Sequence, residues 1–317
     1  MSHLITRKAL EDVEADLRER IEGKATRAYQ KKGFHIGVSV DGSEMSDRAA
    51  HFAAGFIQLK RGDRYTVFHI SDSTKTYLPR HLTPKHLMHY YEDMAARDKL
   101  GLRAEWVCKE KSEGHSTCKT LVKLVDERDL DLLVIGSFGR KGEKLDVLGS
   151  VSDYTLHMCR SSLCIVRSTG SRFDQQAKIL FASDGSHAAN LAFVLTLQYF
   201  RRPLDTVDVI FVATKDPVKE KEWANMYRRY METHQVPGNV EVKQITRTLD
   251  TTVQSTILEA SRDVDILVVG VSGYSQKKMG SVSEFLSIHA RCSTIVVKDH
   301  LDILGPPIVS DAPRFQD

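Results

Sequence analysis

The feature that most constrains the fold of this chain is a long internal repeat. Each half opens with an apolar run that ends in Asp-Gly-Ser, at residues 41–43 and 184–186. A later apolar run in each half is followed by spaced glycines, in the patterns Gly136-x2-Gly139-x9-Gly149-Ser150 and Gly270-x2-Gly273-x6-Gly280-Ser281. Because a repeat of this length fixes the domain count, the sequence predicts two homologous domains, each with a glycine-rich loop after a strand.

The spacing between corresponding positions locates the main difference between the halves. The Asp-Gly-Ser motifs lie 143 residues apart, the first glycines of the two loops 134 apart, and the closing apolar runs 131 apart. The last change, three residues, equals the difference between the x9 and x6 spacings. The second half therefore carries a deletion inside its glycine-rich loop.

Composition narrows the class of protein. A chain of 317 residues with 41% hydrophobic residues is long enough for two packed domains. No stretch approaches the roughly 18 apolar residues that a membrane span needs, and the N-terminus lacks the apolar region of a secretory signal. The net charge of +3 is slight, and the five cysteines form no Cys-x2-Cys pair. We expect a cytoplasmic protein that binds neither membrane nor nucleic acid.

Strand and helix patterns alternate from residue 34 onward. Predicted strands span 34–40, 64–70, 103–108, 131–136 and 163–167, and again 177–183, 206–213, 240–246, 265–270 and 294–298. Predicted helices span 46–60, 84–100, 115–128 and 149–160, and again 187–201, 217–234, 250–263 and 281–291. Strands that alternate with crossover helices indicate parallel sheets covered on both faces. The predicted fold class is α/β, with two doubly wound, open, five-stranded parallel sheets in tandem.

The same patterns predict the domain limits. Domains are expected at 33–168 and 177–298, with a linker at 169–176 and an irregular tail at 299–317. An amphipathic helix is expected within residues 1–32, where Leu10, Val13, Leu17 and Ile21 fall at helical spacing. Two interpretations of that helix remain open, packing on the chain's own domains or binding to a partner protein.

The strand-end motifs suit a phosphorylated ligand. In an open parallel sheet, ligands bind beyond the carboxyl ends of the strands, where Asp41 and Gly136 are expected. Gly136 and Gly139 permit unusual backbone angles and close approach to a ligand. Gly149 and Ser150 begin a helix, whose first N–H groups and dipole favour an anion. Ser150 and Ser152 add hydroxyl donors, and Asp41 is a candidate acceptor for a ribose or an adenine amine. The alternative makes Asp41 a helix cap and the glycines plain turns.

This loop differs from the two common nucleotide-binding loops. It has no Gly-Lys-Ser/Thr ending, so it is not a P-loop, and its glycines follow the fourth strand rather than the first, unlike a dinucleotide fingerprint. At these residues the chain resembles the universal stress protein family. Nucleotide-binding members of that family carry Gly-x2-Gly-x9-Gly-Ser/Thr after the fourth strand and an aspartate after the first.

The resemblance covers about residues 33–168 and 177–298. It implies an adenine nucleotide α-hydrolase-like sheet and ATP, ADP or AMP bound in the first domain, with Mg²⁺ as a companion of ATP. The implied nucleotide ligands are Asp41, Gly136, Gly139, Gly149, Ser150 and Ser152, and residues 68–70 are implied to line the adenine pocket. The secondary candidates in the second half are Asp184, Gly270, Gly273, Gly280 and Ser281. The implied function is that of a nucleotide-responsive stress or regulatory protein.

Three missing residues remove about 10 Å of extended chain from the second loop, at about 3.3 Å per residue. We therefore expect one high-affinity ATP site per chain, in the first domain, with the second site empty, weak or adapted to a smaller phosphate ligand. The alternatives are an interaction module that has lost nucleotide binding, and a slow Mg²⁺-dependent ATPase or adenylating enzyme. No catalytic or metal-binding residue is predicted.

The resemblance also implies how the halves associate. Family members commonly pair through the last strand, here residues 163–166 and 294–297. Fusion of two copies raises their effective concentration, so the pairing is expected within the chain. A homodimer or a protein partner stays open.

Overall fold

The structure is a computed structural model. It describes residues 33–75, 78–97, 104–111, 114–142, 146–167, 176–197, 201–202, 204–214, 218–246, 248, 250–271 and 279–298. The predicted N-terminal helix, the tail, Gly273 and the linker apart from Gln176 lie outside these residues. Among the described helices, none has both the length and the apolar character needed to cross a membrane.

The first domain alternates strands and helices as the sequence predicts. Its elements are β1 (His35–Ser39), α2 (Glu44–Phe56), η1 (Leu59–Arg61), β2 (Arg64–Ser71), η2 (Arg80–Leu82), α3 (Pro84–Arg97), β3 (Ala104–Glu110), α4 (Thr117–Glu127), β4 (Leu132–Gly136), α5 (Ser150–Met158) and β5 (Ser162–Val166). Its strands lie in the order β3-β2-β1-β4-β5 and are all parallel.

The second domain repeats this arrangement. Its elements are β6 (Lys178–Ser183), α6 (His187–Leu195), β7 (Thr206–Ala213), α7 (Val218–Thr233), β8 (Val240–Gln244), α8 (Val253–Ala260), β9 (Ile266–Val271), α9 (Ser281–His289) and β10 (Ser293–Lys298). Its order, β10-β9-β6-β7-β8, mirrors that of the first domain. The predicted tandem of doubly wound α/β domains is confirmed.

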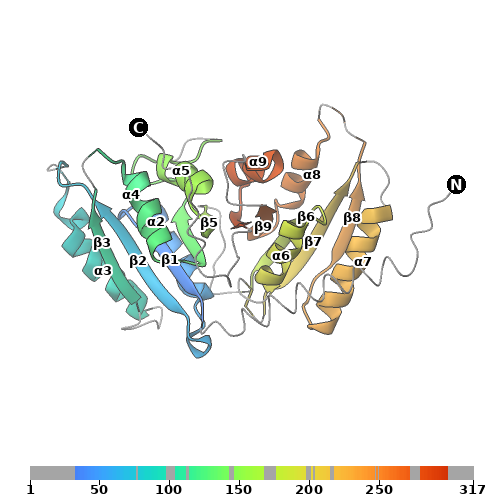
Figure 1. Ribbon diagram of the computed structural model, residues 1–317, viewed down its shortest axis with the longest axis horizontal. Helices are drawn as coiled ribbons and strands as arrows, with labels where there is room; N and C mark the ends of the chain where they lie inside the picture. The colour runs from blue at the N-terminus through green and yellow to red at the C-terminus, as the bar shows by residue number, and fades with distance from the viewer. Residues whose placement is uncertain are drawn as a thin grey trace.

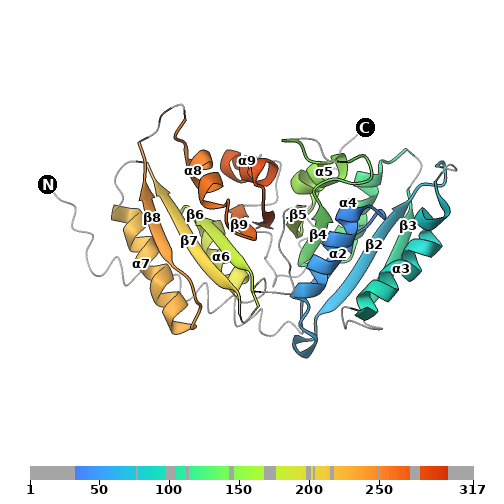
Figure 2. The same cartoon turned by 180° about the vertical axis from the view of Figure 1, so that it is seen from behind.

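The two five-stranded sheets join into one ten-stranded sheet, because β10 pairs antiparallel with β5. Cys164 lies opposite Ile295 in this pair. Cys164 and Ile295 are 131 residues apart, which is the spacing of all corresponding positions near the joint. Cys164 therefore lies opposite its own counterpart in the second half. A local pseudo-twofold axis therefore passes between them, and the predicted pairing of these strands within the chain is confirmed. Figures 1 and 2 show the two domains side by side, with α5 and α9 at the centre.

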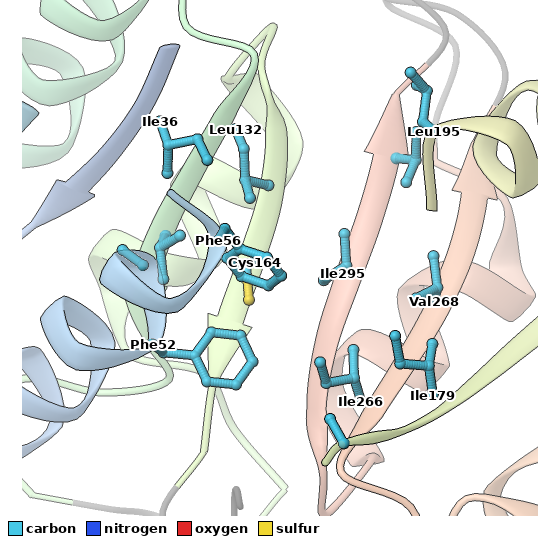
Figure 3. Packing of buried hydrophobic residues seen from close by; sticks show 14 of the residues in the cluster. Ile36, Phe52, Phe56, Leu132, Cys164, Ile179, Leu195, Ile266, Val268 and Ile295 are labelled. Atoms are coloured by element: carbon cyan, nitrogen blue, oxygen red, sulfur yellow. The ribbon is translucent and has the colours of Figure 1, made fainter. Parts of the chain in front are cut away.

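The sheet is buried on both faces, which explains its nearly continuous apolar strands. One cluster of buried side chains packs under α2, α3, α6 and α7, and the other under α4, α5, α8 and α9. Both clusters draw residues from both domains. Figure 3 shows part of the first, with Cys164 and Ile295 on adjacent strands at the joint. The joint is thus part of a continuous core.

Most helix boundaries differ from the sequence prediction by a few residues, for local reasons. Helix α2 starts at Glu44 rather than residue 46, because the Ser43 side chain accepts a hydrogen bond from the Ser46 N–H. Helix α8 starts at Val253 rather than residue 250, because Thr252 and Ser255 form a reciprocal capping box. Strand β3 continues to Glu110 along β2.

Candidate functional site

The Asp-Gly-Ser motif forms a tight turn at the carboxyl end of β1. Gly42 has a φ of +79°, in the left-handed region that favours glycine. The Asp41 Oδ1 atom accepts a hydrogen bond from the Ser43 N–H at 3.0 Å. Ser43, not Asp41, caps α2. The interpretation of Asp41 as a plain helix cap is therefore wrong.

The glycine-rich loop of the first domain meets this turn. The other Asp41 oxygen, Oδ2, accepts a hydrogen bond from the Arg140 N–H at 3.2 Å and lies 3.7 Å from Arg140 Nε. A Cβ atom at Gly139 would lie 2.5 Å from the same oxygen. Glycine at 139 therefore lets the loop pack against the carboxylate. The structure brings Asp41 and Gly139 together, as the sequence predicts, across 98 residues of chain.

Gly136 and Gly149 have roles in packing rather than in backbone conformation. Gly136, Gly139 and Gly149 all lie outside the left-handed region, so the unusual backbone angles expected at Gly136 and Gly139 are not found. A Cβ at Gly136 would lie 3.0 Å from the Met45 Cβ on α2. A Cβ at Gly149 would lie 3.0 Å from the Phe138 Cα, and the Gly149 N–H donates to the Ser137 carbonyl at 2.8 Å. The absence of a side chain at Gly136 lets α2 pack against the end of β4, and its absence at Gly149 lets the start of α5 pack against Phe138.

The N-terminus of α5 lies next to the loop, and its first N–H groups have no partner within the helix. The first hydrogen bond of the helix joins the Asp153 N–H to the Gly149 carbonyl at 2.9 Å, so the N–H groups of residues 150–152 precede the helical pattern. Ser150 is exposed. Ser152 is buried and donates its hydroxyl to the Gly136 carbonyl at 2.7 Å. The Ser152 hydroxyl, which was predicted to donate to a phosphate, instead donates to the backbone of β4.

An aromatic stack that the sequence prediction did not single out lies beside Asp41. The His69 Nδ1 atom is 2.9 Å from the Val40 carbonyl, which can only accept, so Nδ1 carries the proton. The His69 ring stacks on Trp106 at 5.9 Å, and Tyr91 stacks on Trp106 at 6.3 Å. His69 lies within residues 68–70, which the resemblance to the universal stress protein family implies to line an adenine pocket. That resemblance was the one signal in the sequence that pointed to His69.

Burial gives His69 a measurable effect on stability. It lowers the pKa of His69 below its ordinary 6.5, although the Val40 carbonyl acts in the opposite direction. His69 therefore binds a proton more readily in the unfolded chain than in the folded one. Its contribution to the free energy of unfolding is complete above pH 6.5 and declines as the pH falls. We expect a His69→Asn variant, which keeps a donor for Val40, to lose less stability between pH 7 and about 5 in urea titrations. Identical pH dependence in both proteins would contradict this assignment.

The second domain keeps the turn but differs at the loop. Asp184 accepts from the Ser186 N–H at 2.9 Å, Gly185 has a φ of +72°, and Ser186 caps α6. Gly270 packs on α6, where a Cβ would lie 2.7 Å from the Ala188 carbonyl oxygen. Ser281 is the exposed first residue of α9. At Gly280, in contrast, none of the described residues has an atom within 4 Å of where a Cβ would be.

The two N-cap glycines provide a matched pair for a stability test. Gly149 and Gly280 cap α5 and α9, so the cost of alanine at an N-cap is common to both. Only Gly149→Ala also forces a contact with the backbone of Phe138. We expect Gly149→Ala to destabilise the chain by about 1 kcal/mol more than Gly280→Ala, at the low end of overpacking effects. Equal denaturation midpoints for the two variants would show that the contact is relieved without cost.

His86 and His89, which lie one turn apart on α3, have local partners within the described residues. His86 Nδ1 lies 2.7 Å from the Thr83 hydroxyl, and His89 Nδ1 lies 3.4 Å from Glu92. Among the described residues, no group of three or more histidine, cysteine or acidic side chains is placed to hold a metal ion.

The strand order, the Asp-Gly-Ser turns and the loops at the carboxyl ends of β1 and β4 define a tandem, doubly wound α/β protein. The model of the universal stress protein family matches residues 34–167 and 177–298, which together make up most of the chain. The chain therefore belongs to the universal stress protein family, in a two-domain form.

Solved structures agree with this fold. A universal stress protein from Archaeoglobus fulgidus is 16% identical with a TM-score of 0.59, over 83% of this chain and 98% of that one. A functionally unknown protein from Pseudomonas aeruginosa is 14% identical with a TM-score of 0.60, over 86% of this chain and 94% of that one. At such identities the likeness shows the fold alone. Both comparisons span the two domains.

Proposed function

We propose that this chain binds one adenine nucleotide, ATP, ADP or AMP, in its first domain, and that it acts as a nucleotide-responsive stress protein. The observation that carries the proposal is the contact between Asp41 and the Gly139–Arg140 segment beside the open N-terminus of α5. This contact brings an acceptor, a loop and the first N–H groups of α5 together at the carboxyl ends of β1 and β4, where open parallel sheets bind ligands.

The parts of this site have complementary chemistry. The first N–H groups of α5 and the helix dipole favour the phosphates. Arg140, whose side chain is about one-third exposed, adds a cation on the same side. Asp41 is also about one-third exposed and retains lone pairs for a ribose hydroxyl or an adenine amine. The buried His69 ring, near the carboxyl end of β2, stacks on Trp106 of β3.

The second domain fits the alternative role of an interaction module. Among the described residues, no atom lies within 4 Å of where a Cβ on Gly280 would be, so the close packing at Gly149 is not repeated there. The loop before Gly280 is also three residues shorter than the loop before Gly149. We therefore assign the nucleotide to the first domain alone.

Mg²⁺ would accompany ATP chiefly through its phosphate oxygens. Mg²⁺ prefers an octahedral set of oxygen ligands and usually keeps waters. Among the described residues, Asp41 is the carboxylate that contacts Arg140, and both of its oxygens already accept hydrogen bonds from N–H groups. We therefore expect nucleotide binding to persist when the metal is removed with EDTA.

The direct test is to identify what the purified chain carries. The protein is denatured and the supernatant is analysed by mass spectrometry, with an Asp41→Ala and Gly149→Val double variant as the control. An adenine nucleotide released from the wild type and depleted in the variant supports the proposal. A nucleotide-free protein whose melting temperature is unchanged by millimolar ATP, ADP and AMP would contradict it.

A further inference from the structure

A basic residue at the end of each last strand reaches across to the other domain. The Arg167 Nη2 atom, directly after β5, donates to the carbonyls of Ser287 and Ile288 on α9, at 2.6 and 2.8 Å. The Lys298 Nζ atom, at the end of β10, donates to the carbonyls of Leu156 and Cys159, at 2.8 and 2.6 Å. Arg167 and Lys298 are 131 residues apart, so they are counterparts under the pseudo-twofold axis.

The acceptors in both contacts are carbonyls at the C-terminus of a helix. The last carbonyls of a helix lack partners inside it and carry the negative end of its dipole. Lys298 satisfies two of them at the end of α5, and Arg167 does the same for α9. Each domain therefore supplies the C-terminal cap of the other domain's last helix.

Lys298 is held tightly in this position. Only 6% of its surface is exposed. Burial lowers its pKa, while the nearby Cys159 and Asp126 oppose the shift. A buried amine that loses its acceptors incurs a large desolvation cost, so Lys298 and the end of α5 are fixed to each other.

The helix that Lys298 caps is the one that starts at the candidate phosphate site. Helix α5 has nine residues, from Ser150 to Met158. It is therefore only about 13 Å long at 1.5 Å per residue, so that a shift at its C-terminus also moves its N-terminus.

Two further bonds between the domains flank α5. His289 Nδ1 of α9 lies 3.2 Å from Asp146, which precedes α5 in the glycine-rich loop. His157 Nε2 of α5 lies 3.2 Å from Glu284 near the start of α9. The second domain therefore contacts α5 at its C-terminus and the loop just before its N-terminus, at the central position seen in Figure 1.

We propose that Lys298 is a positioning residue for the nucleotide site of the first domain, which is complete only when the second domain is docked. The inference rests on the proposed function above. Lys298 fixes the end of α5, and His289 restrains the loop through Asp146. The second domain thereby acts on the site without binding nucleotide itself, and the two domains are coupled through the joint.

The pseudo-twofold symmetry supplies a matched control for the test. Lys298→Met and Arg167→Met each remove one cross-domain cap, and both are expected to lower the melting temperature. Only Lys298→Met is expected to weaken ATP binding, by about fivefold or more, the lower end of usual coupling between sites. His289→Ala, at a partly exposed position, is expected to weaken ATP binding in the same direction without threatening the fold. Arg167→Met is expected to stay within about twofold of wild type.

A second readout keeps this inference separate from nucleotide binding. Hydrogen exchange of the free protein should show faster exchange at residues 146–153 in Lys298→Met, and at the corresponding start of α9 in Arg167→Met. Equal effects of both variants on affinity, or unchanged exchange at 146–153 in Lys298→Met, would overturn the proposal. If wild type binds no nucleotide, the proposed function fails, and the exchange measurement alone decides the role of Lys298.

Discussion

Aspartate in place of either Ile165 or Val296 is expected to reduce the free energy of unfolding by more than about 4 kcal/mol, which is exceptional for a single substitution. Both side chains are fully buried, on β5 and β10 at the joint between the domains. A carboxylate buried there would be shielded from solvent and would lack a cation to pair with, so it would either stay charged at a large free-energy cost or bind a proton. Because the two positions are pseudo-twofold counterparts, we expect similar losses from the two variants.

Urea unfolding and size-exclusion chromatography measure this effect. Gln244→Asp, at the exposed end of the edge strand β8, serves as the control and should change stability by less than about 0.5 kcal/mol. If Ile165→Asp and Val296→Asp leave both the unfolding midpoint and the hydrodynamic size unchanged, β5 and β10 do not form the joint.

Gly149→Val is expected to weaken adenine nucleotide binding by more than about tenfold, or 1.4 kcal/mol. The valine Cβ would lie 3.0 Å from the Phe138 Cα, and backbone cannot move aside as the end of a side chain can. The N-terminus of α5 would therefore shift away from the glycine-rich loop of the first domain. Calorimetry measures the affinity, at a temperature well below the melting point of the variant.

The matched control is Gly280→Val, at the N-cap of α9. In the part of the chain that the structure describes, no atom lies within 4 Å of the position of its Cβ, so nucleotide affinity should match that of the wild type. Equal affinity for Gly149→Val and wild type would mean that α5 does not contact the ligand.

The fold could be predicted from the sequence because its signals are local and repeated. Runs such as Leu132–Ile135 fit strands buried on both faces, and their recurrence in the second half supports that interpretation. Helix boundaries were less accurate, since they depend on the side chain that caps each helix, as Thr252 does for α8. The strand order within each half was not predicted and comes from the structure.

The candidate site was predicted in part. Asp41 and Gly139 meet because both lie at strand ends of one sheet, and position alone predicts that. The role of Gly136 depends on Met45 packing from α2, and the bond from Ser152 depends on the path of α5. Such contacts depend on tertiary packing and leave no trace in spacing.

The sequence contains a feature that indicates the hydrogen bonds between the domains. A basic residue follows the closing apolar run in both halves, Arg167 in the first and Lys298 in the second. Since last strands of this kind pair antiparallel, a cation at the end of one strand comes close to the other domain. Identifying the acceptors still required the structure, because helix carbonyls carry no sequence identity.

The most direct measurement of the central claim is a calorimetric titration of the nucleotide-free chain with ATP. One site per chain is predicted, abolished by the pair Asp41→Ala and Gly149→Val and retained in the pair Asp184→Ala and Gly280→Val. Two equivalent sites per chain, or a single site that survives the first pair and is lost in the second, would contradict the account.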